Sequence, residues 1–199
     1  MASVKNVYPS LRRETILDAA IRLFQQRGFD GLGMRQIADC LQIRAPSLYH
    51  HFASKEDLAR QALRQYREEQ ATRLLAIAER SDLSEKLQMY AELFTEMLND
   101  GKRPCMYLVM VREPSVQEGS CAEELRLFAK QNVDWLEAIL RRGKCEPVAR
   151  AGVPERSVAE IIFASLEGLM AISLADKKPS VAFRKRATDF LKVVMNSLK

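Results

Sequence analysis

Residues 44–51 place small, hydroxylated and ring-bearing side chains on one short stretch with a helical pattern. Leu48 and Phe52 are its apolar positions, and we expect both to point inward. The opposite face then presents Arg44, Ala45, Ser47, Tyr49, His50 and His51. Groups of this size, with hydroxyl and ring donors, reach phosphates and base edges when a short helix lies in the major groove. The pattern predicts a DNA recognition helix, although Tyr49 packing mainly into the core is an equally open interpretation.

The charge distribution agrees with such a surface. The net charge is +5, and residues 1–67 hold 11 Lys and Arg against 6 Asp and Glu, whereas the remainder is balanced. A local basic excess favours a phosphate backbone, because phosphates neutralised by the protein release their counterions. Chance clustering of surface charge is the alternative.

The sequence contains no residue pattern that is typical of a catalytic site or a metal site. His50 and His51 are the only histidines, and adjacent residues on a helix point about 100° apart. The four cysteines, Cys40, Cys105, Cys121 and Cys145, form no C-x-x-C pair. No nucleophile–base pair or Gly-rich phosphate loop is visible. We therefore expect no metal, no cofactor and no enzymatic activity; a helical-bundle enzyme and an adaptor that does not bind DNA are the alternatives.

Cys105 has a second interpretation. It follows Pro104 near an expected helix start, with Lys102 and Arg103 beside it. Nearby cations and a helix N-terminus lower a thiol pKa and favour reactivity, which predicts a redox or electrophile sensor. An inert buried cysteine is the alternative.

The apolar period is helical almost throughout, and no strand pattern stands out. Starts are predicted at Ser54 with Asp57, at Ser84, and at Ser120 with Glu123, where Ser or Thr precedes an acidic residue in the manner of a helix cap. About nine helices are expected, near residues 10–28, 34–41, 46–52, 54–80, 84–101, 104–114, 120–143, 154–177 and 180–198. The fold class is therefore all-α.

The helices at 155–177 and 180–198 carry more apolar residues than one contact face needs. Small residues such as Gly168 allow another helix to approach closely. Copies of both helices in a second subunit would cover them, which predicts a homodimer; an ordinary buried helix pair is the alternative. The apolar runs are too short for a membrane span, so we expect a cytoplasmic protein with no membrane partner.

A specific resemblance is carried by SLYHHFASKEDL, by the preceding MRQIADCLQIR and by a first helix ending LFQQRGFDGL. Over about residues 10–60 the chain resembles the DNA-binding domain of the TetR family of transcriptional regulators. Residues 8–54 are thereby expected to be the helix-turn-helix domain, and residues 55–199 the ligand-binding and dimerisation domain, a larger helical bundle. The resemblance implies a homodimeric repressor that binds a pseudo-palindromic operator and is released by a small-molecule effector of unknown identity; an activator or nucleoid-associated factor is the alternative.

Carried over position by position, the resemblance assigns DNA contacts to a set of residues around the second and third helices. Base edges are expected at Arg44, Ala45 and Ser47, and phosphate at Arg35 and Lys55. Tyr49 and His50 are expected to contact phosphate or sugar, with His50 also able to reach a base, and Pro46 completes the set of DNA-binding residues. Family members commonly have glycine where this chain has Gln42 and Pro46. These departures do not change the expected fold, but they affect the expectation of which DNA bases the helix contacts.

The resemblance also implies an effector pocket among the C-terminal helices. Large apolar side chains suited to its lining are Tyr90, Phe94, Met97, Tyr107, Met110, Trp135 and Phe163. A Met and aromatic stripe at helical spacing is more often core than pocket, so ordinary core packing is the alternative. Asn132, Glu137 and Glu167 are candidate polar groups for the pocket and equally candidates for the surface. A redox regulator acting through Cys105 is the second reading of the same domain.

Overall fold

The computed structural model describes residues 12–99, 103–143 and 152–197, and within these ranges it contains helices and no strand. The helices are α1 (Arg13–Arg27), α2 (Met34–Cys40), α3 (Ala45–His51), α4 (Lys55–Ala78), α5 (Leu83–Asn99), α6 (Met106–Met110), α7 (Pro114–Gln117), α8 (Cys121–Arg142), α10 (Glu155–Ser173) and α11 (Pro179–Ser197). The predicted all-α fold class is confirmed. The single turn α7 is an addition to the expected elements, and the expected start at Ser10 lies outside the described residues.

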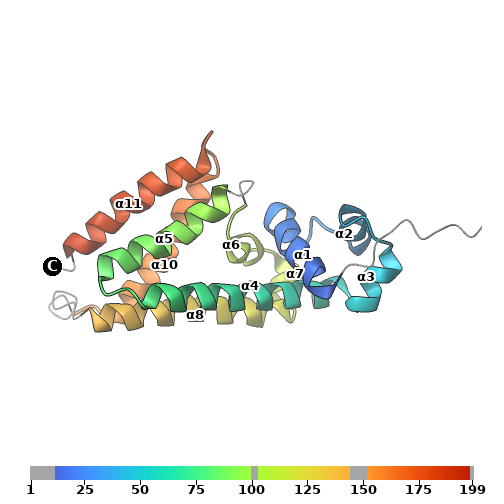
Figure 1. Cartoon of the computed structure of the whole chain (residues 1–199), viewed down its shortest axis with the longest axis horizontal. Coiled ribbons are helices and arrows are strands. Elements are labelled where there is room, and N and C mark those ends of the chain that lie inside the picture. Colours follow the sequence, from blue (N-terminus) through green and yellow to red (C-terminus); the bar gives the residue numbers. More distant parts are fainter. Residues whose placement is uncertain (1–11, 100–102, 144–151, 198–199) are drawn as a thin grey trace, which may run out of the picture.

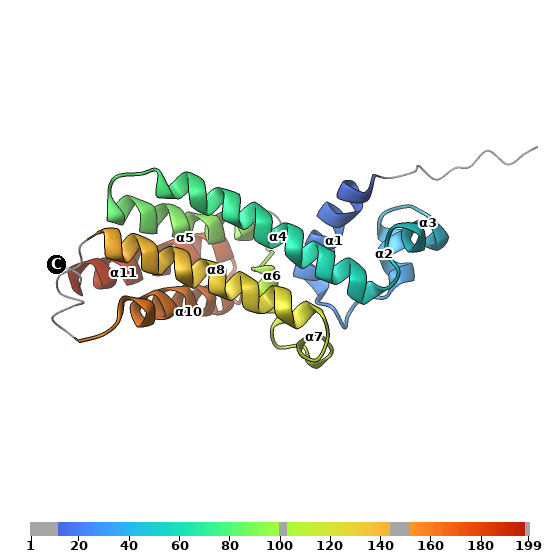
Figure 2. The same cartoon turned by 90° about the horizontal axis from the view of Figure 1, so that it is seen from below.

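The long helix α4 connects the two ends of the molecule (Figure 1). At one end α1 packs on α4 and α2 packs on α3; at the other, α5, α8, α10 and α11 form a bundle. α8 lies along α4, as both views show, and α10 packs against both α8 and α11 (Figure 2). α4 is therefore in contact both with α1 in the N-terminal part and with α5 and α8 in the bundle.

The helix starts show which predicted caps form. The Asp57 N–H donates to Ser54 Oγ at 3.0 Å, so the predicted cap of α4 is confirmed. At α5 the capping acceptor is Asp82, which receives the Glu85 N–H at 2.8 Å; the prediction of Ser84 was wrong because the helix begins one residue earlier. The predicted Ser120–Glu123 cap also does not form.

Ser120 instead faces another helix. Its N–H and its hydroxyl both donate to Glu56 Oε1, at 2.8 and 3.0 Å, and Glu56 lies in the first turn of α4. These bonds lower the pKa of Glu56. The start of α8 is thus joined to the start of α4, beside the N-terminal helices.

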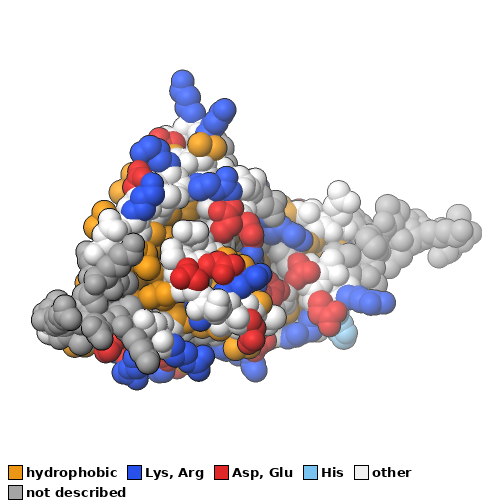
Figure 3. Space-filling model, turned by 60° about the vertical axis from the view of Figure 1, so that its left-hand side comes forward, with side chains coloured by type: hydrophobic (Ala, Val, Ile, Leu, Met, Phe, Trp, Pro, Cys, Tyr) orange, Lys and Arg blue, Asp and Glu red, His pale blue; other side chains and the backbone are white. Residues whose placement is uncertain are grey.

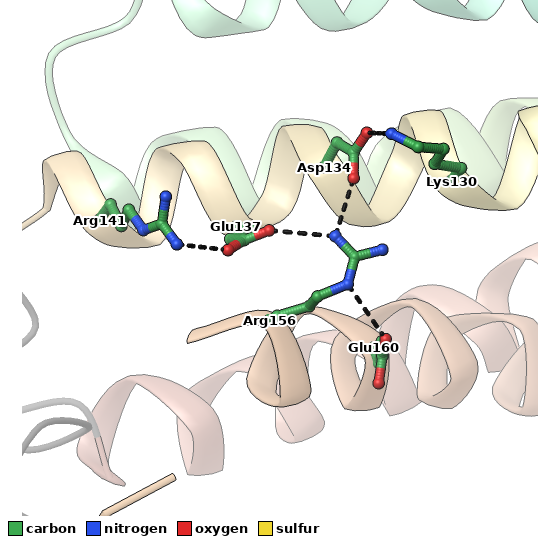
Figure 4. Close-up of polar contacts among 6 residues, drawn as sticks. All are labelled: Lys130, Asp134, Glu137, Arg141, Arg156 and Glu160. Atoms are coloured by element: carbon green, nitrogen blue, oxygen red, sulfur yellow. Dashed lines mark hydrogen bonds and ion pairs between the residues drawn. The ribbon is translucent and has the colours of Figure 1, made fainter. Parts of the chain in front are cut away.

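An ion-pair network joins α8 to α10 near their exposed ends (Figure 4). The guanidinium of Arg156 lies 2.9 Å from Asp134, 3.2 Å from Glu137 and 3.5 Å from Glu160. Lys130 and Arg141, both on α8, complete it through Asp134 and Glu137. Exposed pairs of this kind each contribute about 0.2–1 kcal/mol, so the network orients α10 more than it stabilises the fold.

No helix among the residues that the structure describes is both long and apolar enough to cross a membrane.

Candidate nucleic-acid interface

The turn between α2 and α3 holds the two helices at a fixed angle. Its N–H groups bond back to carbonyls at the end of α2, with Gln42 donating to Asp39 O and Ile43 to Ala38 O, both at 3.0 Å. Ile43 is buried between the helices. Gln42 has φ 54°, in the left-handed region, which a residue with a Cβ adopts only at a free-energy cost. The turn geometry therefore explains why a glycine suits this position.

α3 is only seven residues long and is held by burial of one face. Leu48 is fully buried, and Phe52, directly after the helix, is 1% exposed. The Phe52 N–H donates to Leu48 O at 3.0 Å, and the guanidinium of Arg13 lies 5.1 Å from the Phe52 ring centroid. The predicted inward face of α3 is thus observed, with α1 contributing to its support.

The other face of α3 is turned to solvent. Arg44, Pro46, Tyr49 and His50 are exposed, while Ala45, Ser47 and His51 are half-buried. Tyr49 is 49% exposed, which removes the interpretation that its ring belongs mainly to the core. The face combines a guanidinium, two hydroxyls and an imidazole on a helix narrow enough for a major groove, which is suited to contacts with bases and phosphates.

Two further predicted contacts flank α3. Arg35 is exposed in the first turn of α2. Lys55, at the start of α4, is half-buried: its ammonium donates to Phe29 O at 3.0 Å and lies 3.9 Å from the Phe29 ring centroid. An ammonium has three donors, so Lys55 retains some capacity for a phosphate while it also stabilises the N-terminal helices. The phosphate role of both residues stays a prediction.

The predicted effector-pocket residues come together in the bundle as packed core. Tyr90, Phe94, Met110 and Phe163 are buried, and Met97, Tyr107 and Trp135 are half-buried. Ring contacts join several of them, at centroid distances of 5.5 Å for Tyr90–Phe94, 5.2 Å for Tyr90–Trp135 and 5.5 Å for Tyr107–Phe163. Whether they line an effector site stays a prediction.

Sequence reasoning missed Tyr66 and Phe128, which sit inside this aromatic cluster. Their rings stack at 5.4 Å, and the Tyr66 hydroxyl lies 3.5 Å from Cys105 Sγ. Of the candidate polar groups, Asn132 and Glu167 are buried, and Glu137 belongs to the network between α8 and α10. Helical periodicity places Tyr66 on the inner face of α4, but it does not reveal which buried residues α6 and α8 bring against it.

Cys105 is 1% exposed, and burial raises the pKa of its thiol well above the usual value. The predicted lowering of that pKa was wrong: the cations adjacent in the sequence do not compensate for removal of the thiolate from water. Cys121 is also buried, which raises its pKa to about 12. Thiols in these environments are poor nucleophiles, so the geometry gives no support to a sensor at Cys105.

No group of three or more His, Cys, Asp or Glu side chains that could hold a metal ion occurs in the described ranges.

Comparison with known proteins places the N-terminal segment in a family. Residues 16–62 match the model of bacterial regulatory proteins of the tetR family. The segment is 41% identical over 58 residues to the HTH-type transcriptional repressor KstR2 of Mycolicibacterium smegmatis, covering 29% of this chain and 28% of that protein. It is 38% identical over 52 residues to the biofilm operon regulator IcaR of Staphylococcus aureus, covering 26% and 28%. The matches therefore span little more than a quarter of these relatives' length.

Solved structures extend the likeness to nearly the whole chain. A TetR family regulator from Agrobacterium tumefaciens superimposes with a TM-score of 0.78 and 25% identity, over 92% of this chain and 98% of that one. AibR, solved with isovaleryl coenzyme A and operator DNA, superimposes with a TM-score of 0.67 and 20% identity, over 92% and 97%. The N-terminal helix-turn-helix segment therefore matches the tetR family of bacterial regulatory proteins, and the chain as a whole has the fold of TetR family regulators.

Proposed function

We propose that this chain is a transcriptional repressor that binds a pseudo-palindromic operator as a homodimer and is released by a small-molecule effector. The observation that carries the proposal is the solvent face of α3, where Arg44, Tyr49 and His50 are exposed while Leu48 anchors the helix from behind. The relatives KstR2 and IcaR are named as a repressor and a negative regulator, which supports the sign of regulation.

The proposed contacts divide by chemistry. The start of α3, with Arg44, Ala45, Pro46 and Ser47, meets base edges, because a recognition helix enters the major groove with its N-terminal residues. Tyr49 and His50 bind sugar or phosphate, and Arg35 and Lys55 bind the flanking phosphates. The small side chains at positions 45–47 allow the helix backbone to approach the bases closely.

A homodimer through α10 and α11 is supported by apolar side chains left in water. Ile161 and Ile172 on α10 are 56% and 59% exposed, and Val181 and Val193 on α11 are 58% and 66% exposed. A Cβ placed at Gly168 would meet nothing within 4 Å, so this side of α10 is open. Figure 3, turned toward the end of the molecule where the bundle lies, shows hydrophobic side chains in a hollow bordered by charged ones, so apolar groups are exposed at this end. A second copy that covers this apolar surface would pair two α3 helices for two operator half-sites.

Release by an effector is supported by the mechanical path between the bundle and α3. α4 runs from the aromatic core to the segment directly after α3, so an occupant that repacks the core moves α4 and with it the spacing of the paired α3 helices. AibR, which shares the fold, is described in complex with both an acyl coenzyme A and operator DNA.

The DNA-binding proposal is tested by selecting genomic fragments that bind the purified protein and measuring their affinity by fluorescence anisotropy. Arg44→Ala and Tyr49→Ala are each expected to weaken binding to the selected fragment about 5- to 150-fold, the effect of losing one good contact of about 1–3 kcal/mol. Arg126→Ala removes an exposed cation on α8, far along the chain from α3, and is the matched control. Unchanged affinity in both α3 variants would overturn the assignment.

The dimer is tested separately by sedimentation. Ile172→Glu is expected to shift the protein toward monomer, because a charge would be buried in the interface. Leu75→Glu is the matched control: Leu75 is 68% exposed on α4, away from α10 and α11. A monomeric wild-type protein, or a dimer unaffected by Ile172→Glu, would contradict the proposed interface.

A further inference from the structure

Glu167 is a carboxylate without a hydrogen-bond partner inside the bundle. It lies on α10, is 6% exposed, and neither Oε1 nor Oε2 receives a hydrogen bond in the described part of the chain. The Cys105 thiol lies near enough to lower the pKa of Glu167 against the larger effect of burial, but neither carboxylate oxygen has a hydrogen-bond partner. A buried charged group without partners is destabilising, so its presence calls for a physical explanation.

The groups around Glu167 are aromatic and weakly polar. Burial is the main cause that raises the pKa values of Tyr66, Tyr90, Tyr107 and Cys105, and the Glu167 carboxylate raises each of them further. No cationic side chain contributes to the pKa of Glu167, which burial raises to about 7. The site therefore has one acceptor, with unfilled lone pairs, in surroundings made of rings.

Tyr107, one of the residues near Glu167, also lines a cavity at the surface. A cavity of about 390 Å³ is lined by Tyr107, Val111, Gln117, Ala122, Leu125, Arg126 and Ala129, most of them apolar. The half-buried ring of Tyr107 forms its inner wall and contacts Phe163, one turn before Glu167 on α10, at a centroid distance of 5.5 Å. Tyr107 therefore faces the cavity on one side, and on the other it lies close enough to Glu167 for the carboxylate to raise its pKa further, after burial.

We propose that Glu167 binds the cationic nitrogen of the effector, a small molecule with a protonated amine on an apolar body, and that the body occupies the cavity beside Tyr107. The proposal rests on the effector-released repressor proposed above and adds the chemical class of the effector. A cation fills the empty lone pairs of the carboxylate and is attracted to the faces of neighbouring rings. An anion, such as an acyl carboxylate, would be repelled by an ionised Glu167.

A cationic ligand also changes the protonation of the site. Without ligand, Glu167 holds a proton for much of the time at neutral pH, because its pKa is about 7. An ammonium group favours the ionised carboxylate, so the proton on the Glu167 carboxyl passes to buffer when the amine binds. Nearly one proton per site is expected to be released at pH 6 and clearly fewer at pH 8, following the ionisation of one group.

The experiment uses the full chain without DNA and a panel of phenylalkyl and n-alkyl primary amines of graded length, each paired with the alcohol of the same skeleton. Affinity is measured by calorimetry in buffers of different ionisation enthalpy, which also counts released protons. The best amine is expected to bind at least about tenfold more tightly than its alcohol, the effect of one charge-assisted contact. Glu167→Gln, nearly equal in size, is expected to abolish this preference, and Glu160→Gln, exposed on the same helix, to retain it.

The outcomes separate this site from the function on which it rests. If no amine exceeds its alcohol, if Glu167→Gln binds amines as wild type does, or if wild type releases no proton at pH 6, the Glu167 site is overturned. Proton release by wild type is independent of how well the variant folds. Operator affinity is measured in parallel: amine binding that leaves operator affinity unchanged supports the site and contradicts effector release.

Discussion

The carboxylate of Glu113, just before α7, accepts the backbone N–H of Phe29, just after α1, at 2.7 Å. The same oxygen accepts the Asp30 N–H at 2.9 Å. Gly28 makes this approach possible: it has φ 70°, and a Cβ there would lie 1.9 Å from Glu113 Oε1. Together with the Glu56–Ser120 bonds, this contact ties the N-terminal helices to α7 and to the start of α8.

Glu113→Ala is expected to lower the free energy of unfolding by about 1–3 kcal/mol, because two backbone donors lose a charged acceptor. Glu113→Gln retains one amide oxygen and is expected to lie between Ala and wild type. Chemical denaturation measures all three, with Glu118→Ala, an exposed glutamate nearby, as the control. Equal stability of Glu113→Ala and wild type would show that water replaces the contact without loss.

Gln42→Gly is expected to stabilise the protein. Gln42 has φ 54°, where a side chain is strained and glycine is not. The gain is at most about 1 kcal/mol, since glycine also increases the entropy of the unfolded chain. Thermal unfolding compares it with Gln42→Ala, which keeps the Cβ and is expected to show no gain. A lower melting temperature for the glycine variant would contradict the strain.

Features within one helix and contacts between distant segments were predictable from the sequence to different degrees. The periodicity of Leu48 and Phe52 predicted correctly which face of α3 is buried, because a short helix beside two neighbours has one buried side. The contact of Glu113 with Phe29 joins residues 84 positions apart in the sequence and leaves no local signal. Cys105 misled the prediction for a related reason: its sequence neighbours are basic, but the three-dimensional packing around it removes water.

Glu167 is expected to make stability fall as pH rises. Its pKa is about 7 in the folded protein against 4.5 in the unfolded chain, so the folded state holds a proton more tightly. The stabilisation is complete below about pH 4.5 and is lost as pH rises through about 7, a change of about 3 kcal/mol at most. Tyr66, Tyr90, Cys105 and Tyr107 face the same region with raised pKa values and stay protonated throughout this window.

Denaturation from pH 4.5 to 8 tests this, with Glu167→Gln as the reference. The stability difference between variant and wild type should widen in favour of the variant across this range. Parallel pH profiles for the two proteins would show that the Glu167 pKa is not raised.

Thiol reactivity is expected to follow burial. Cys40 is exposed, whereas Cys105 and Cys121 are buried with raised pKa values. In a Cys40→Ser/Cys145→Ser variant, an aromatic disulfide reagent should react only as fast as the protein opens. Wild type provides the comparison in which exposed Cys40 reacts first. Rapid reaction of the double variant under native conditions would contradict this prediction, because it would show that the thiol of Cys105 or Cys121 is reactive in the folded protein.

The salt dependence of operator binding tests the central claim, that α3 and its flanks contact DNA, most directly. The logarithm of the wild-type association constant should fall linearly with the logarithm of salt concentration, with a slope set by the number of neutralised phosphates. Arg35→Ala should reduce that slope by about 1, whereas Ser47→Ala, at a proposed base contact, should lower affinity for the operator and leave the slope unchanged. The same slope in wild type and Arg35→Ala, with full operator affinity in Ser47→Ala, would contradict the account.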